Sequence, residues 1–172
     1  MRIFLRPVTV DDSNMIAKWR NSPNVRNHCF SKRLITEETN KIFFHQFVET
    51  GKYKQFIVNR IDDDFGVVSY PIASVYLKDI DLDNLRCELC VFTSDDEEWN
   101  SESQICAIDM LVDKAFNEYG IRKIYSYVFK RNNDEVALLK NAGFVEESIL
   151  YREAIDLEGN EADIVRLCVF KK

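Results

Sequence analysis

Residues 104–144 read QICAIDMLVDKAFNEYGIRKIYSYVFKRNNDEVALLKNAGF, and this stretch decides the fold. Apolar residues recur at helical spacing over residues 104–119, and Gly120 then ends the predicted helix. Residues 121–130 follow as a strand that is apolar on both faces, which is typical of a central strand. A second, short helix is opened by Asn132 and closed by Gly143. The segment therefore predicts a helix–strand–helix unit built onto the middle of a sheet.

The remaining elements extend this sheet on both sides. The form of a capping box at residues 9–12 and the start of a helix at Thr36 predict two N-terminal helices. Further strands are predicted at residues 1–7, 53–59, 72–77 and 86–93, and a closing hairpin at residues 148–155 and 163–170. The fold class is α+β (α/β): a mixed, mostly antiparallel sheet of six to seven strands, flanked by about four helices. The absence of linkers and repeats predicts a single domain over residues 1–172.

Composition narrows the class of protein. The 172 residues carry a net charge of −6 without a basic tract, so nucleic acid is not an expected partner. Apolar runs stay shorter than the roughly 20 residues that span a bilayer, which predicts a cytoplasmic chain without membrane contact. The five cysteines are expected to be reduced thiols. Cys87 and Cys90 lie three residues apart on one strand, so they should face opposite sides, and no metal site is expected.

Four segments together resemble the GNAT N-acetyltransferases. They are Leu5-Arg6-Pro7 with residues 19–26 (WRNSPNVR), residues 72–77 (IASVYL), residues 132–144, and the final hairpin from Gly143-Phe144 to residues 163–165. The first is similar to the branch that acetylates nucleotide-linked amino sugars, in the pseudaminic acid pathway. The last is similar to the ribosomal-protein N-terminal acetyltransferases. The resemblance implies the GNAT fold, acetyl-CoA as co-substrate and a small-molecule primary amine as acceptor.

The same resemblance implies where acetyl-CoA binds. The acyl-pantetheine arm should insert between two splayed parallel strands, residues 86–93 and 121–130, and the pyrophosphate should rest on the N-terminus of the long helix. The residues expected to contact the cofactor are Val91, Phe92, Thr93, Ser101, Ser103, Gln104, Ile105 and Asn132.

One segment departs from the family pattern. The pyrophosphate loop is usually rich in glycine, whereas residues 99–104 (WNSESQ) contain none and carry Glu102 where the central glycine would stand. Residues 95–98 add four acids. A carboxylate about 6 Å from a phosphate charge opposes it by about 0.7 kcal/mol in water. We therefore expect weakened acetyl-CoA binding that improves with salt, and a catalytically weak or silent GNAT-fold binding protein stays open as an alternative. The other interpretation is that the acids point to solvent while residues 101–105 still present their amides to the pyrophosphate.

Candidate catalytic and acceptor-binding residues follow from the same comparison. Glu88 is the first candidate for the general base, because its strand borders the splayed site, although a carboxylate on a solvated strand face is the alternative. His45 is the second candidate. Trp19, Arg20, Asn21 and His28 are expected to contact the acceptor. Leu139 stands where many relatives have a tyrosine that acts as the general acid for the CoA thiolate. A protein N-terminus or a polyamine remains an alternative acceptor, and a homodimer is left open.

Overall fold

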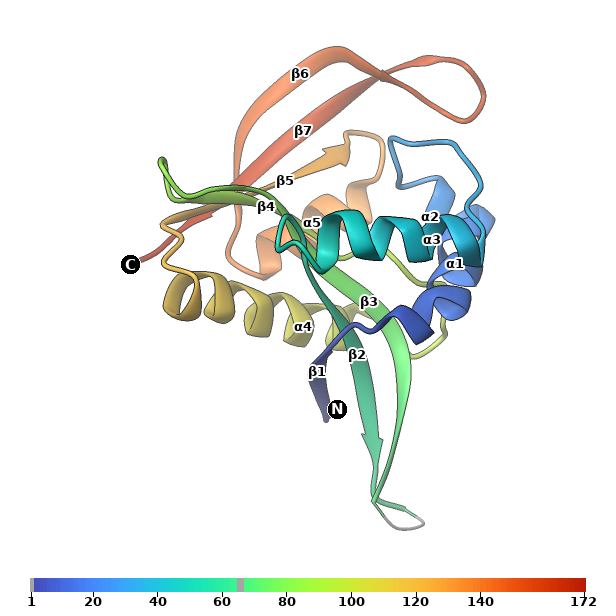
Figure 1. The fold of residues 1–172 in the computed structure, drawn as a ribbon. Helices are drawn as coiled ribbons and strands as arrows, with labels where there is room; N and C mark the ends of the chain where they lie inside the picture. Colours follow the sequence, from blue (N-terminus) through green and yellow to red (C-terminus); the bar gives the residue numbers. More distant parts are fainter. Residues whose placement is uncertain (1, 65–66) are drawn as a thin grey trace.

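A twisted sheet with strand order β1-β2-β3-β4-β5-β7-β6 organises the molecule (Figure 1). The computed structural model describes residues 2–64 and 67–172. Within them the strands are β1 (Ile3–Pro7), β2 (Lys54–Asp62), β3 (Val68–Asp81), β4 (Arg86–Cys90), β5 (Lys123–Phe129), β6 (Val145–Ile155) and β7 (Glu161–Phe170). All neighbours are antiparallel except β4 and β5, which run parallel. The predicted mixed, mostly antiparallel sheet is confirmed, with seven strands in the described part of the chain.

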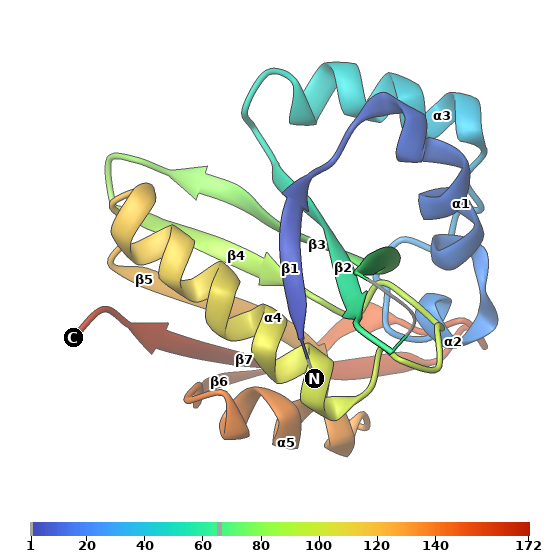
Figure 2. The same cartoon turned by 90° about the horizontal axis from the view of Figure 1, so that it is seen from below.

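Helices cover both faces of this sheet. In the described ranges they are α1 (Ser13–Asn21), α2 (Pro23–Arg26), α3 (Glu37–Phe43), α4 (Ser101–Asp113) and α5 (Asn133–Asn141), one more than the four expected. A short 3-10 turn, η1 (Val10–Asp12), precedes α1, and α3 and α4 continue as the π-helical turns η2 (Phe44–Val48) and η3 (Lys114–Glu118). Seen from below, α4 and α5 lie against one face while α1 and α3 lie on the other (Figure 2).

Two apolar clusters hold these layers together. The larger lies between the sheet and the helices α4 and α5, and includes Ile72, Leu89, Ile108, Leu111, Ile124 and Leu139, each at most 1% exposed. The smaller lies under α1 and is formed by Val8, Ile16, Trp19 and Ile57. The apolar stripe of α4 faces the sheet as its sequence spacing predicted.

The parallel pair β4 and β5 separates after three residue pairs. The register joins Arg86 to Lys123, Cys87 to Ile124 and Glu88 to Tyr125, and pairing then stops although β5 continues to Phe129. The hydroxyl of Ser126 donates to the carbonyl oxygen of Leu89 over 2.9 Å, at the point where the strands diverge. The predicted splay is therefore present, and it positions the site described below.

Several predicted boundaries were wrong. β4 ends at Cys90 rather than at residue 93, and α4 begins at Ser101 rather than at residue 104. β2 and β3 pair as far as Asp62 and Val68, so most of the expected connection over residues 61–71 is strand. Residues 65 and 66 of that connection lie outside the described ranges. Pairing between β2 and β3 extends these two strands beyond what their local side-chain pattern shows.

In the described ranges no helix has the length and apolar composition needed to cross a bilayer.

Candidate active site

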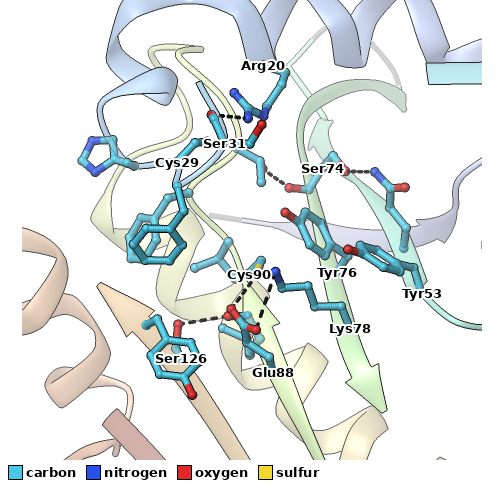
Figure 3. A pocket seen from close by; sticks show the side chains of 18 of the residues that line it. Arg20, Cys29, Ser31, Tyr53, Ser74, Tyr76, Lys78, Glu88, Cys90 and Ser126 are labelled. Carbon is cyan, nitrogen blue, oxygen red and sulfur yellow. Dashed lines mark hydrogen bonds and ion pairs between the residues drawn. The ribbon is translucent and has the colours of Figure 1, made fainter. Parts of the chain in front are cut away.

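A pocket of about 260 Å³ opens where β4 and β5 separate (Figure 3). Its walls come from α1, β2, β3, β4 and the chain that follows β4, the middle of β5, and the segment after α2. The residues that give it its chemistry are Arg20, His28, Cys29, Tyr53, Tyr76, Lys78, Glu88, Cys90, Phe92, Thr93 and Tyr127. We call it the splay pocket.

Glu88 is buried in the wall of the splay pocket. It is 5% exposed, and its Oε2 lies 3.6 Å from Nζ of Lys78, which stands opposite it on β3. Sγ of Cys90 lies 3.7 Å from Oε1, so Lys78, Cys90 and Glu88 converge on one space (Figure 3). Burial raises the pKa of Glu88 to about 7; Lys78 opposes this shift and Asp79 adds to it. A carboxyl group with this pKa can take or give a proton near neutral pH.

The two cysteines of β4 lie as predicted. Cys87 is fully buried in the larger core cluster, whereas Cys90 faces the splay pocket. All five cysteines are free thiols. The described residues contain no group of His, Cys, Asp and Glu side chains arranged to hold a metal ion.

Residues 27–35, which we call the acceptor loop, form one rim of the splay pocket. Asn21 holds this loop through its carboxamide, which donates to the carbonyl oxygen of Ile35 over 2.6 Å and accepts from its amide over 2.8 Å. The guanidinium groups of Arg20 and Arg26 donate to the carbonyl oxygens of Ser31 and Lys32 over 2.8 and 3.1 Å. Side chains of the WRN segment (residues 19–21) and of Arg26 thus fix the loop backbone.

These contacts separate the predicted acceptor residues into two groups. Arg20 and His28 line the splay pocket. Trp19 is 9% exposed and packs in the smaller core cluster, whereas Asn21 binds the backbone of the acceptor loop. Neither belongs to the lining of the splay pocket.

A second pocket of about 270 Å³ lies between the N-termini of α4 and α5. His28 and Phe92 line both pockets, so the two are neighbours. The second pocket is lined by Asn24, Val25, His28, Phe92, Ser94, Asp95, Asp96, Trp99, Ser101, Gln104, Asp134, Glu135 and Leu138. We call it the helix pocket. Four carboxylates line it, and among its described lining residues there is no lysine or arginine.

The predicted cofactor residues divide between the two pockets and the protein interior. Val91, Phe92 and Thr93 line the splay pocket, and Ser101 and Gln104 line the helix pocket. Ser103 is fully buried and its hydroxyl donates to the carbonyl oxygen of Glu98 over 2.6 Å, while Ile105 packs against the core.

The N-terminus of α4 is capped by its own chain. Oδ1 of Asn100 accepts hydrogen bonds from the amides of Glu102 and Ser103 over 3.0 and 3.4 Å. The indole of Trp99 donates to the carbonyl oxygen of Val91 over 3.1 Å. An N-cap of this kind satisfies helix amides that an anion could otherwise bind.

The acids just before and at the start of α4 lie in different places. Glu98 accepts hydrogen bonds from Arg60 and from the hydroxyl of Tyr70, which belong to the β2–β3 hairpin. Glu102 is exposed and does not belong to the lining of the helix pocket. Asp95 and Asp96 do line it, together with Asp134 and Glu135 from α5, which the sequence interpretation missed.

Three further predicted residues are placed as follows. Asn132 is the N-cap residue of α5, and its Nδ2 lies 3.1 Å from Nδ1 of His28, which also contacts the carboxylate of Glu135. Burial and the nearby Arg131 lower the pKa of His28. His45 lies exposed on η2, 3.0 Å from Glu49, and is not part of the splay pocket. Leu139 is fully buried in the core.

Sequence reasoning also missed Tyr53, Tyr76 and Lys78. Tyr53 and Tyr76 stack with ring centroids 5.5 Å apart on the wall opposite β5 (Figure 3). The alternation of β3 contained the signal, since residues 74, 76 and 78 share one face and the apolar residues 75 and 77 the other.

Comparisons with known proteins agree with this architecture. Spermidine N-acetyltransferase from Vibrio cholerae, in complex with CoA and spermine, superposes with a TM-score of 0.84 at 21% identity, over 98% of this chain and 95% of that one. A chimera of the Vibrio cholerae enzyme SpeG with hSSAT gives 0.81 at 21% identity, over 99% and 96%. These likenesses show the fold. No curated protein matches the chain by sequence similarity.

The family itself follows from a match to a domain description. The model of the acetyltransferase (GNAT) domain matches residues 2–145, so the chain belongs to this family of acetyl-CoA-dependent N-acetyltransferases.

Proposed function

We propose that the chain transfers acetyl from acetyl-CoA to the primary amine of a small molecule whose other groups are neutral or anionic, as in a nucleotide-linked amino sugar. One observation carries the proposal: among the described residues lining the splay pocket, Glu88 is the one carboxylate, and Arg20 and Lys78 are cationic. Nη1 of Arg20 is also buried and has no hydrogen-bond partner among the described residues. An anionic group on the acceptor would satisfy it.

The chemistry assigned to this pocket needs one base. Glu88 takes a proton from the acceptor ammonium, and the neutral amine attacks the thioester carbonyl carbon. A C–N bond forms and the C–S bond breaks; the attached nitrogen releases its second proton, and the CoA thiolate takes up that proton through water. Leu139 is buried in the core and cannot supply that proton, whereas thiolate is stable enough to leave without an acid.

Cofactor binding is assigned to the slot between the splayed strands. In this proposal the acyl arm passes Val91, Phe92 and Thr93 and reaches the splay pocket, and the pyrophosphate lies near Ser101 and Gln104 in the helix pocket. The separation of β4 from β5 after Glu88 supports this path.

A polyamine is the second candidate acceptor. The names of the superposing enzymes favour it, since they are spermidine N-acetyltransferases. The charge of the splay pocket opposes it, because a polycation would lie against Arg20 and Lys78 with one carboxylate to neutralise it. Three further alternatives stay predictions from the sequence: a protein N-terminus as acceptor, a catalytically weak or silent protein, and a homodimer. Sedimentation analysis tests for the homodimer.

An acceptor panel tests the proposal. CoA release would be measured with a uridine-diphosphate-linked amino sugar, spermidine and a peptide with a free N-terminus. We expect the highest kcat/KM for the nucleotide-linked amine. Higher kcat/KM for spermidine would overturn the proposed acceptor class, and no turnover with any amine would favour the silent alternative.

A variant tests the base. Glu88→Gln should lower kcat/KM by about 100-fold or more, typical for a general base, with acetyl-CoA affinity nearly unchanged. Glu38→Gln, which changes an exposed carboxylate of α3, is the matched control. Equal kcat/KM in the two variants would exclude Glu88 as the base.

A further inference from the structure

Ser126 fills a hydrogen-bonding position that the backbone of β5 would occupy if its parallel pairing with β4 continued. At the start of the pair the amide of Lys123 donates to the carbonyl oxygen of Leu85 over 3.3 Å. Alternate residues of a strand point their backbone groups to the same neighbour. Further along the same register, the carbonyl oxygen of Leu89 would therefore accept from the amide of Tyr127. In the structure it accepts from the hydroxyl of Ser126 instead, over 2.9 Å.

The other edge of β5 agrees with this register. The amide of Lys130 donates to the carbonyl oxygen of Asp163, and the carbonyl oxygen of Arg122 accepts from the amide of Lys171, both over 2.9 Å. Even-numbered residues of this segment thus bond to β7 and the chain that follows it. The backbone groups of the odd-numbered residues, including Tyr127, are directed at β4. The amide of Tyr127 is therefore the group that could close the ladder on Leu89.

The hydrogen bond from Ser126 marks a gap between the two strands. Side chains of a regular sheet stand out of its plane, and paired strands lie about 4.8 Å apart. A hydroxyl that reaches the carbonyl of the neighbouring strand replaces a direct backbone bond, so the strands diverge here, beside Glu88 (Figure 3). Ser126 is 3% exposed, and a buried carbonyl oxygen without a donor is destabilising. The hydrogen bond therefore stabilises the separated arrangement.

The opposite side of the slot is also held by hydroxyl groups. Backbone pairing between β3 and β4 ends at Cys90. Beyond it, the hydroxyl of Thr93 donates to the carbonyl oxygen of Ser74, and that of Ser94 donates to the carbonyl oxygen of Ile72 over 2.6 Å. These bonds tie the chain after β4 to β3, away from β5. Both sides of the slot are thus positioned by side chains of the protein itself.

We propose that Ser126 is a positioning residue for acetyl-CoA: its hydroxyl holds β4 and β5 apart, so the slot for the acyl arm is formed before the cofactor binds. The inference rests on the cofactor path proposed above. Without this hydroxyl, the amide of Tyr127 bonds directly to Leu89 and the strands pair further. The acyl arm must then break that bond to enter the slot.

Hydrogen exchange of the Tyr127 amide, followed by nitrogen-15 NMR, tests the separation of the strands. In the wild type we expect faster exchange than at Tyr125, which lies in the paired part of β5. In Ser126→Ala we expect the Tyr127 amide to exchange more slowly by roughly tenfold or more, because it then bonds to Leu89. Equal protection of the two amides in the wild type would overturn the inference without any variant.

Calorimetric titration and steady-state kinetics test the consequence for the cofactor. Ser126→Ala should weaken acetyl-CoA binding by roughly three- to tenfold, the effect of breaking one backbone hydrogen bond. The KM for acetyl-CoA should rise by the same factor. The kcat and the KM for the acceptor should stay near the wild-type values, because the bound complex is the same once the strands have separated. Ser126→Thr keeps the hydroxyl and should bind acetyl-CoA as the wild type does.

Ser13→Ala is the matched control. Ser13 is fully buried, and its hydroxyl oxygen accepts from the carboxamide of Asn40 over 3.1 Å, so the variant loses a buried hydrogen bond between α1 and α3. Its Tyr127 exchange and its acetyl-CoA affinity should match the wild type.

The two measurements together separate the possible failures. Weaker binding in Ser126→Ala without slower exchange would mean that Ser126 contacts the cofactor directly, and would overturn its role in holding the strands apart. Slower exchange with unchanged affinity would overturn its role in cofactor binding. If the wild type itself binds no acetyl-CoA, the proposed function fails, whereas failure of the inference alone leaves wild-type binding intact.

Discussion

The imidazole of His28 stacks on the ring of Phe92, with ring centroids 5.9 Å apart and planes at 25°. On the other side of the splay, Phe30 packs against Phe129 with centroids 5.1 Å apart. The acceptor loop thus touches the chain that continues β4 and also the end of β5. Since His28 and Phe92 line both pockets, their contact separates the splay pocket from the helix pocket.

His28→Ala should therefore speed the association of acetyl-CoA several-fold. The imidazole stands between the two pockets that the cofactor would join, and its removal leaves a wider passage. Stopped-flow fluorescence of Trp99, which lines the helix pocket, measures the rate. Asn27→Ala, an exposed neighbour in the same loop, is the control. A slower association in His28→Ala would mean that the ring attracts the cofactor instead of blocking it.

The fold was predictable because each element carries its own pattern. The helical stripe of α4 and the two-sided apolar β5 are local signals, and short connections leave few ways to assemble them. The position of Glu88 followed from the same logic, because its strand lies next to the crossover helix. Boundaries were less accurate for two reasons. Pairing with a distant segment lengthened β2 and β3. The N-cap residue Asn100 also starts α4 earlier than its apolar stripe indicates.

The site was less predictable because it depends on contacts between distant segments. Asp134 and Glu135 begin α5, and only the packing of α4 beside α5 brings them to the pocket near Ser101. Ser126 bonds to Leu89, 37 residues earlier in the chain, and this contact leaves no mark in the alternation of either strand. The WRN segment carried a family pattern, but its hydrogen bonds to the backbone of the acceptor loop depend on the path of that loop.

Asn21→Ala should raise the KM for the acceptor and leave acetyl-CoA affinity nearly unchanged. The variant loses both hydrogen bonds to Ile35, each contributing about 1 kcal/mol, so the acceptor loop loses a fixed end. Steady-state kinetics with each substrate varied in turn measures the effect, with Asn27→Ala as control. A parallel rise in both KM values would contradict a role confined to the loop.

The ion pair between Arg6 and Asp12 should give the protein a pH-dependent stability. Arg6 donates to both carboxylate oxygens over 2.7 and 2.8 Å, and the amide of Thr9 adds a bond of 2.8 Å. Although burial opposes ionisation, the bonds from Arg6 and Thr9 lower the pKa of Asp12. A carboxyl group whose pKa is lowered in the native protein stabilises the fold at pH values above its pKa in the unfolded chain. This contribution is lost as the pH falls through its pKa in the native protein.

Asp12→Asn should therefore reduce the free energy of unfolding by about 1.5 to 3 kcal/mol at pH 7. The difference from the wild type should shrink as pH falls below about 4, the value of an unfolded aspartate. Urea unfolding at several pH values measures it, and Asp11→Asn, at an exposed neighbouring position, is the control. An equal loss at pH 7 and pH 3 would show that charge is not its origin.

Acetyl-CoA binding should be weakened by the acids of the helix pocket and should tighten as salt rises. The sequence placed the opposing charge at Glu102 and at residues 95–98. Of these acids, Asp95 and Asp96 line the pocket, together with Asp134 and Glu135. Asp96 and Glu135 hold other groups, since Asp96 accepts from the amide of Glu98 and Glu135 contacts His28, whereas Asp95 and Asp134 are exposed. These two can therefore be changed with little effect on the fold.

Asp95→Asn and Asp134→Asn should each strengthen acetyl-CoA binding by about 0.7 kcal/mol, roughly threefold, if each carboxylate lies about 6 Å from a phosphate charge. The double variant should gain about tenfold and lose most of the salt dependence, because screening relieves a repulsion that is no longer there. Glu97→Gln makes the same charge change in the same loop at an exposed residue outside the pocket lining, so its gain should be smaller. Calorimetric titration at low and high salt measures the wild type and the four variants. The opposite result would be salt-independent binding by the wild type with no gain in affinity in the double variant. It would place the pyrophosphate away from the helix pocket, and the hydrogen bonds by which Asn100 caps α4 would then stay intact when the cofactor binds.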